Sequence, residues 1–237
     1  MTSESTAHYP IGRVTRSKRD AARTYDSLSG VYDLLSRGLE WKLTEEGLKE
    51  LEPKTGESVL EIGFGAGHGL LYNARRVGPG GKVIGVDISP GMIRSARSRI
   101  DDAHFADVVE LTRGDGSTLA FAPESFDAAF MSFVLELFDT PEIPVVLSEA
   151  LRVLKPGGRI CVVALSIRGH GPVLRMYGWA HEHFPNYADC RPIRAEEFVK
   201  DAGFRIQQSR SASMWGLPVE IVVGIKAKSN GESPSAI

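Results

Sequence analysis

The 237-residue sequence lacks the features that mark several common protein classes. It contains two cysteines, Cys161 and Cys190, so no disulfide framework is expected. Its N-terminus has no apolar signal region, and no stretch approaches the length of a membrane span. A net charge of −2 provides no basic field for nucleic acid. We therefore expect a cytoplasmic monomer or homodimer with no nucleic-acid partner and at most peripheral membrane contact.

The sequence also lacks a catalytic triad and any cluster of residues with metal-ligand spacing. The best histidine pair, His181 and His183, is two residues apart, so on a helix the two side chains diverge and cannot close a metal site together. We therefore predict that the activity needs no metal.

What the sequence does contain is a glycine-rich turn between a short apolar run and a helical segment. The run Ser58–Ile62 is typical of a buried strand, and Leu70–Val77 is typical of a helix. Gly63, Gly65 and Gly67 lie between them, where missing Cβ atoms allow the backbone to approach a ligand. A tight turn that binds no ligand is the alternative at this point.

Two carboxylates favour a ligand site. Asp87 ends the next apolar run roughly 20 residues after the glycines, the place where an acid contacts nucleotide ribose in doubly wound folds. Glu61 precedes the glycines and would suit a cation better than a pyrophosphate. The spacing is G-x-G-x-G, with His68 where a dinucleotide fingerprint has its third glycine. A nicotinamide-dependent oxidoreductase is therefore disfavoured.

Alternating apolar runs and helical segments predict an α/β fold with a doubly wound, mostly parallel sheet. Two runs near the end have no helix between them, so they can form an antiparallel edge pair. The expected strands are Ser58–Ile62, Lys82–Val86, Val108–Thr112, Ser125–Met131, Arg159–Ser166, Phe204–Ser211 and Pro218–Lys226. The expected helices include Pro90–Ile100, Pro141–Leu154, Pro172–Phe184 and Arg194–Ala202.

Four motifs together resemble the class I S-adenosylmethionine-dependent methyltransferases. They are Glu61-Ile-Gly63-Phe-Gly65-Ala-Gly67, Val86-Asp87-Ile88-Ser89, Gly114-Asp115-Gly116 and Leu154-Lys155-Pro156-Gly157-Gly158. Tyr25-Asp26-x-x-Ser29-x-x-Tyr32-Asp33 is similar to the branch with ubiquinone and menaquinone C-methyltransferases. The resemblance covers about Tyr25 to Lys226.

The resemblance implies a Rossmann-like methyltransferase fold of seven strands, with an antiparallel last strand and an N-terminal helical lid. It implies S-adenosylmethionine as the cofactor, with Asp115 bonding the adenine amino group. The implied cofactor-binding residues are Tyr25, Glu61, Gly63, Gly65, Gly67, Asp87, Ile88, Met92, Gly114, Asp115, Gly116, Met131 and Ser132. We expect one methyltransferase domain over 21–228, with the lid at 21–51, an acceptor-recognition insertion at 167–192, and flexible tails at 1–20 and 229–237.

The acceptor is predicted to be a small molecule, with C-methylation of a quinone-like ring favoured by the lid motif. N-, O- or S-methylation, a phospholipid amine and a non-catalytic S-adenosylmethionine-binding regulator remain alternatives. Met131 to Leu135 lacks the Asn/Asp-Pro-Pro-aromatic motif of enzymes that act on DNA adenine. Arsenite is disfavoured because only two cysteines are present.

A phenol or hydroquinone acceptor would gain from a base that removes its proton. His181 is the predicted catalytic base, because an imidazole has an unperturbed pKa of about 6.5 and His181 shares an apolar helical stripe with Tyr177. Tyr32 is the second predicted catalytic residue, as a group that could hydrogen-bond the acceptor. Tyr25 and Glu136 are competing candidates.

Overall fold

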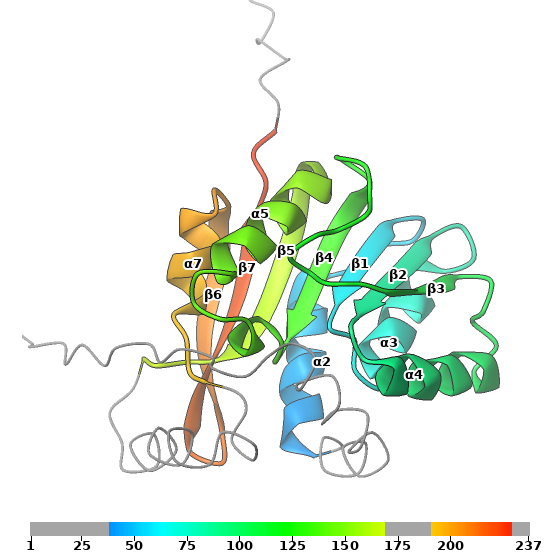
Figure 1. Ribbon diagram of the computed structural model, residues 1–237, viewed down its shortest axis with the longest axis horizontal. Coiled ribbons are helices and arrows are strands. Elements are labelled where there is room, and N and C mark those ends of the chain that lie inside the picture. Colours follow the sequence, from blue (N-terminus) through cyan, green and yellow to red (C-terminus); the bar gives the residue numbers. More distant parts are fainter. Residues whose placement is uncertain (1–37, 169–190, 229–237) are drawn as a thin grey trace, which may run out of the picture.

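The computed structural model describes residues 38–168 and 191–228 (Figure 1). Several predicted features lie outside this range: both tails, the first part of the lid with Tyr25 and Tyr32, and the helix Pro172–Phe184 with His181. The proposed domain limits at 20, 21 and 229 therefore remain predictions.

A seven-stranded sheet in the order β3-β2-β1-β4-β5-β7-β6 forms the centre of the fold (Figure 1). Strands β1 to β5 pair in parallel, whereas β7 is antiparallel to both β5 and β6. The predicted mostly parallel sheet with an antiparallel last strand is therefore confirmed. The strands are β1 Ser58–Ile62, β2 Lys82–Asp87, β3 Val109–Arg113, β4 Phe126–Ser132, β5 Leu154–Leu165, β6 Arg205–Met214 and β7 Leu217–Ile225.

Helices cover both faces of this sheet, and each face has its own hydrophobic core. The first core receives side chains from α2 (Leu39–Leu51), α3 (His68–Val77) and α4 (Pro90–Asp102). The second receives side chains from α5 (Ile143–Val153) and α7 (Ala195–Asp201). Strand alternation divides the sheet between the cores, with Val59 in the first and Leu60 in the second.

The residues just before helix α4 determine where that helix begins. The Ser89 Oγ accepts a hydrogen bond from the Met92 backbone N at 3.2 Å, which satisfies an amide with no partner inside the helix. Pro90 occupies the first turn, where its missing N–H has no cost. The helix therefore begins directly after the Asp87 end of β2.

Strand β5 begins earlier than the sequence predicts. The sequence predicts a helix that ends at Leu154 and a strand that starts at Arg159, with Lys155 to Gly158 between them. In the structure the strand begins at Leu154, which pairs with Phe126, and the register shifts before Arg159 pairs with Ala128. Backbone hydrogen bonds from Gly157 N to Lys226 O, and from Lys226 N to Gly158 O, hold this segment against the chain after β7.

Helix α2 is held against the sheet by two arginines from distant segments. The Arg159 Nε donates to the Leu51 carbonyl at 2.6 Å, at the C-terminal end of the helix. Arg210 on β6 lies 2.8 Å from Glu46 and 3.4 Å from Glu50. These contacts fix the orientation of α2 at several points along its length.

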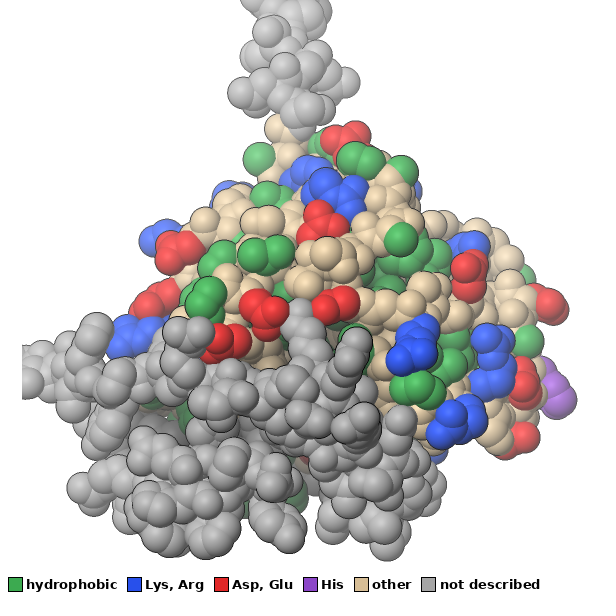
Figure 2. Space-filling view, in the orientation of Figure 1, with side chains coloured by type: hydrophobic (Ala, Val, Ile, Leu, Met, Phe, Trp, Pro, Cys, Tyr) green, Lys and Arg blue, Asp and Glu red, His purple; other side chains and the backbone are tan. Residues whose placement is uncertain are grey.

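The described surface carries charges of both signs. On the described part of the face in Figure 2, acidic and basic side chains are interspersed and hydrophobic ones are scattered. Within residues 38–168 and 191–228, no helix combines the length and hydropathy that a membrane crossing requires.

Candidate active site

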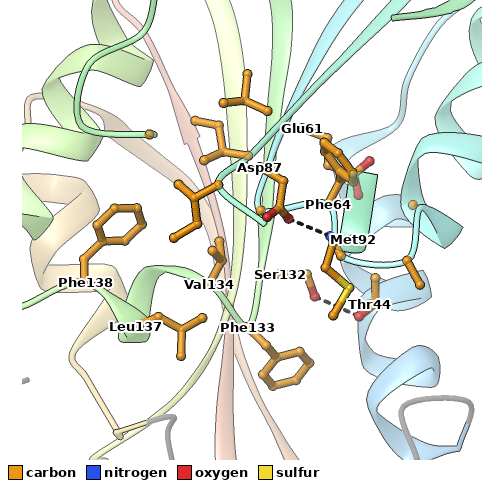
Figure 3. A pocket seen from close by; sticks show the side chains of 18 of the residues that line it. Thr44, Glu61, Phe64, Asp87, Met92, Ser132, Phe133, Val134, Leu137 and Phe138 are labelled. Atoms are coloured by element: carbon orange, nitrogen blue, oxygen red, sulfur yellow. Dashed lines mark hydrogen bonds between the residues drawn. The ribbon is translucent and has the colours of Figure 1, made fainter. Parts of the chain in front are cut away.

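A pocket opens at the carboxyl ends of β1, β2 and β4 (Figure 3). Most of the predicted cofactor-binding residues line it, and they come from four separate segments of the chain. Those that line the pocket are Glu61, Gly63, Gly65, Asp87, Ile88, Met92, Gly114, Asp115, Gly116 and Ser132. In the strand order, β1 lies between β2 and β4, which is the switch point where doubly wound folds bind ligands.

The three glycines of the turn all have positive φ, but for different reasons. A Cβ built on Gly65 (φ 52°) meets no atom within 4 Å, so the turn leaves open space there. A Cβ on Gly63 (φ 69°) would lie 2.2 Å from Val134 Cγ2, and one on Gly67 (φ 86°) would lie 2.8 Å from Ala96 Cβ. Gly65 is therefore the glycine that leaves room for a ligand, whereas Gly63 and Gly67 allow close packing.

Asp87 joins the turn to the start of α4. Its Oδ2 accepts a hydrogen bond from Gly65 N at 3.1 Å, and its Oδ1 accepts one from Ser89 N at 2.9 Å. Figure 3 shows the Asp87 carboxylate directed into the pocket. The end of β2 thus supplies a carboxylate of fixed orientation beside the open space at Gly65.

Glu61 is a buried carboxyl group at the base of the pocket, only 5% exposed. The Asn73 Nδ2 donates to its Oε2 at 3.0 Å, and a Cβ on Gly69 would lie 2.3 Å from its Oε1. Burial raises the pKa of Glu61 from 4.5 to about 8; the Asn73 hydrogen bond opposes this rise, and the negative charge of Asp87 adds to it. A cation in the pocket would favour the ionised form.

Asp115 follows β3 between Gly114 and Gly116. Its Oδ1 accepts hydrogen bonds from Ser117 N at 2.9 Å and from Ser117 Oγ at 2.8 Å. The side chain therefore orders its own turn while it lines the pocket.

The β4 end of the pocket includes residues that the sequence did not identify. Thr44 Oγ1 on α2 lies 2.7 Å from Ser132 Oγ. One turn earlier, the Trp41 ring centroid lies 5.5 Å from that of His68 at the start of α3. Beyond Ser132, an apolar wall comes from Phe133, Val134, Leu137 and Phe138.

Residues 59–158 match the family described as the methyltransferase domain. The ubiquinone/menaquinone biosynthesis C-methyltransferase UbiE of Hahella chejuensis is 31% identical over 172 residues, which cover 70% of this chain and 68% of the relative. The chain belongs to the S-adenosylmethionine-dependent methyltransferases.

Two other relatives of this chain differ in their names. A demethylmenaquinone methyltransferase of Symbiobacterium thermophilum is 37% identical over 144 residues, 60% of this chain and 55% of the relative. A nocamycin O-methyltransferase of Saccharothrix syringae is 36% identical over 138 residues, 57% of this chain and 48% of the relative. The chain thus spans about half the length of these two relatives.

Solved structures match this chain over most of its length and show its fold. The [4+2]-cyclase SpnF has a TM-score of 0.75 at 18% identity, covering 94% of this chain and all of SpnF. An S-adenosylmethionine-dependent methyltransferase from Aquifex aeolicus has a TM-score of 0.62 at 23% identity, covering 83% of this chain and 97% of that chain.

Three predicted cofactor residues are not among the described lining residues of the pocket. The Met131 side chain is fully buried in the core beneath α5 and does not line the pocket, so its cofactor role stays a prediction. Gly67 caps α3 and packs against Ala96. Tyr25, the third residue in this group, lies outside the described residues.

Of the candidates His181, Tyr32 and Glu136, the structure describes only Glu136. His181 and Tyr32 lie outside the described residues, so their roles remain predictions. Glu136, the competing candidate, is fully buried in the short 3-10 helix η1 (Leu135–Leu137), and its Oε1 accepts a hydrogen bond from Leu165 N at 3.0 Å. It does not line the pocket, so it is poorly placed to accept a proton from a substrate there.

The residues that sequence reasoning missed come mainly from α2 and from the segment after β4. Trp41 gave a signal, since it adds apolar surface beyond the stripe that a buried helix needs. Thr44 and Phe133 gave none, because neither belongs to a motif. Among the described residues, no group of three or more His, Cys, Asp or Glu side chains is placed to hold a metal.

Proposed function

We propose that the protein transfers a methyl group from S-adenosylmethionine to a small aromatic acceptor. The observation that carries the proposal is the open space at Gly65 beside the Asp87 carboxylate, at the point where β1 separates β2 from β4. A Cβ would fill this space, and a ribose bearing two hydroxyls would fit against the carboxylate. Family membership supports the choice of cofactor, and this geometry supports binding at the turn.

The charges around the pocket also suit this cofactor, which carries a sulfonium and an ammonium group. Among the described lining residues there is no lysine or arginine. The lining carboxylates are Glu40, Glu61, Asp87, Asp115, Asp139 and Glu142. Such a pocket favours a cation over an anion, and Glu61, in its buried position, would interact with it in a low-dielectric setting.

When bound, the cofactor supplies a methyl group on a good leaving group. The chain has then to hold the acceptor in line and to exclude water, so proximity and orientation supply much of the rate. The apolar side chains of Trp41, Phe133, Val134 and Leu137 would form a dry wall for an aromatic ring.

C-methylation of a quinone-like ring is the favoured reaction, because the relative from Hahella chejuensis is named a C-methyltransferase. Other relatives are named for quinone-related compounds, including a 2-phytyl-1,4-naphtoquinone methyltransferase of Synechococcus elongatus at 35% identity. In such a reaction the ring carbon gains the methyl group and loses its proton. O-methylation is the second candidate, since the nocamycin O-methyltransferase is equally similar at 36% identity.

For the proton, we retain His181 as the proposed base and Tyr32 as a group that contacts the acceptor. General bases contribute typically 10²–10⁴-fold, so His181→Gln should lower kcat by about 100-fold or more and remove the acidic limb of the pH–rate profile. Tyr32→Phe serves as the comparison, with cofactor affinity measured for both variants. An unchanged acidic limb in His181→Gln would exclude this base.

The function is tested with the purified protein, methyl-labelled S-adenosylmethionine and two probes: a reduced 2-prenyl-1,4-naphthoquinone and its monohydroxy naphthol analogue. We expect label on a ring carbon of the first probe. Label on oxygen would select the second candidate. If the protein binds the cofactor but labels neither probe, the aromatic acceptor class is wrong.

A further inference from the structure

The order of the strand ends along the pocket indicates where the methyl acceptor would bind. Asp87, suited to ribose, ends β2, and Glu61, suited to the positive sulfonium end, lies on the neighbouring β1. The next strand in the same direction is β4, which ends at Ser132. If the cofactor extends from β2 to β1, the methyl acceptor must lie beyond it, at the end of β4.

At this place two hydroxyl groups meet across the pocket (Figure 3). Thr44 Oγ1 and Ser132 Oγ are 2.7 Å apart, and both residues line the pocket. A hydrogen bond between two hydroxyls uses one O–H and one lone pair. It leaves the second O–H and further lone pairs to interact with a ligand oxygen.

The surroundings of this hydroxyl pair are aromatic. Trp41 lies one helical turn before Thr44, and its ring packs against His68. Phe133 directly follows Ser132, is 6% exposed and has a φ of 52°, which is unusual for a bulky side chain. Its N–H donates to Val163 O at 2.8 Å, which helps to hold this strained turn at the end of β4.

The pair is also held on rigid elements. Ser132 is the last residue of β4, a central strand, and Thr44 lies on α2 two residues before Glu46, which pairs with Arg210. Two hydroxyls fixed in this way can receive a polar group without first becoming ordered, which favours binding.

We propose that the Thr44 and Ser132 hydroxyls together bind an oxygen atom of the methyl acceptor, namely a ring hydroxyl or carbonyl of a quinone-like compound. This assignment rests on the proposed function. In this assignment the Ser132 side chain contacts the acceptor rather than the cofactor. Thr44 orients the acceptor ring relative to the methyl group.

The test uses Thr44→Val and Ser132→Ala, with Thr55→Val and Ser125→Ala as controls at positions outside the pocket. The probe is a reduced 2-prenyl-1,4-naphthoquinone. Its KM and kcat are measured at saturating S-adenosylmethionine, and its Kd for the protein with bound S-adenosylhomocysteine is measured by calorimetry. The affinity of S-adenosylhomocysteine itself is measured in the same variants.

We expect each pocket variant to raise the KM and Kd of the probe by about three- to tenfold, the effect of one lost neutral hydrogen bond. The affinity for S-adenosylhomocysteine should change by less than about twofold, and both controls should behave as wild type. The double variant should cost less than the product of the two single effects, because the hydroxyls act as a unit.

Two monohydroxy naphthol analogues, each lacking one ring oxygen, sharpen the result. In wild type, loss of the bound oxygen should weaken binding, and in the double variant the same loss should have no further effect. The proposal is overturned if the probe's KM and Kd are unchanged in both variants, or if the affinity for S-adenosylhomocysteine falls in step with them. If wild type neither binds nor methylates the probe, the proposed acceptor class fails together with this assignment.

Discussion

The two halves of the pocket differ in how far apart their partners lie in the sequence. On the proposed cofactor side, Gly65 and Asp87 are 22 residues apart, and Glu61 and Asn73 are 12 apart. On the proposed acceptor side, Thr44 and Ser132 are 88 residues apart. The cofactor side is thus built from successive strand–helix turns, whereas the acceptor side forms only when α2 packs on the sheet. Recognisable motifs are therefore expected on the first side alone.

The largest effect is expected from a substitution at Gly65, on the proposed cofactor side of the pocket. Gly65→Val places a branched side chain in the open space of the turn and should weaken S-adenosylmethionine binding by about 100-fold or more. Gly56→Val is the matched control, since Gly56 also has a positive φ (83°) and open space around its built Cβ but lies outside the pocket. Calorimetry gives the affinities, and circular dichroism checks the fold. Equal affinities in the two variants would mean that the turn is only structural.

Asp87→Ala should have the next largest effect. Loss of the carboxylate leaves two ribose hydroxyls and the Gly65 amide without their acceptor. The binding free energy of the cofactor should weaken by about 2 kcal/mol, which is a ~30-fold lower affinity. Asp87→Asn should fall between this variant and wild type, because its amide oxygen still accepts one hydrogen bond. The assignment of Asp87 to the ribose is wrong if both variants bind the cofactor as tightly as wild type.

Two buried carboxyl groups, one lining the pocket and one outside it, allow a comparison through the pH dependence of stability. Burial raises the pKa of Glu61, which lines the pocket, and of Glu136, which does not, from 4.5 to about 8 in each case. Both groups therefore bind protons more tightly in the folded protein. The stability they contribute is fully present below pH 4.5 and is lost as the pH rises toward 8.

The Tm of the cofactor-free protein should accordingly fall between pH 5 and pH 8. Glu61→Gln and Glu136→Gln should each flatten part of this slope. Saturating S-adenosylmethionine should remove only the Glu61 part, because a cation lowers the pKa of a carboxyl beside it. If the cofactor changes the slope equally in wild type and in Glu61→Gln, Glu61 does not contact the positive end of the cofactor.

The smallest effect is expected from metal removal. Neither half of the pocket contains a described group of side chains that could hold a metal, so dialysis against a chelator should leave both turnover and cofactor affinity unchanged. Activity that disappears on chelation and returns with a divalent ion would contradict this prediction.

The cofactor side could be predicted closely because its signals are short-range. The strand Ser58–Ile62 has the expected bounds, and Asp87 reaches the turn that its position implied. Prediction was weaker for Met131, which belongs to the right strand end but points into the core beneath α5. Neighbouring residues of a strand face opposite sides, so of the two predicted residues Met131 and Ser132 only Ser132 has its side chain at the pocket.

The acceptor side shows where such reasoning stops. Ser132 was predicted as a cofactor residue, but nothing in the sequence pairs it with Thr44. That pairing depends on how α2 lies on the sheet, which Arg159 and Arg210 set through contacts with segments more than 100 residues away. No periodicity or motif encodes a contact of this kind.

By itself, the sequence determined the family, the parallel sheet and the glycine-rich turn that we propose receives the cofactor. These follow from apolar periodicity and from backbone conformations that only a few residue types adopt readily. Only the tertiary structure decided which glycine leaves room for a ligand, that Glu61 is buried with a raised pKa, and that two hydroxyls meet at the end of β4. These properties depend on the atoms around a residue, and packing brings most of those atoms from distant parts of the chain.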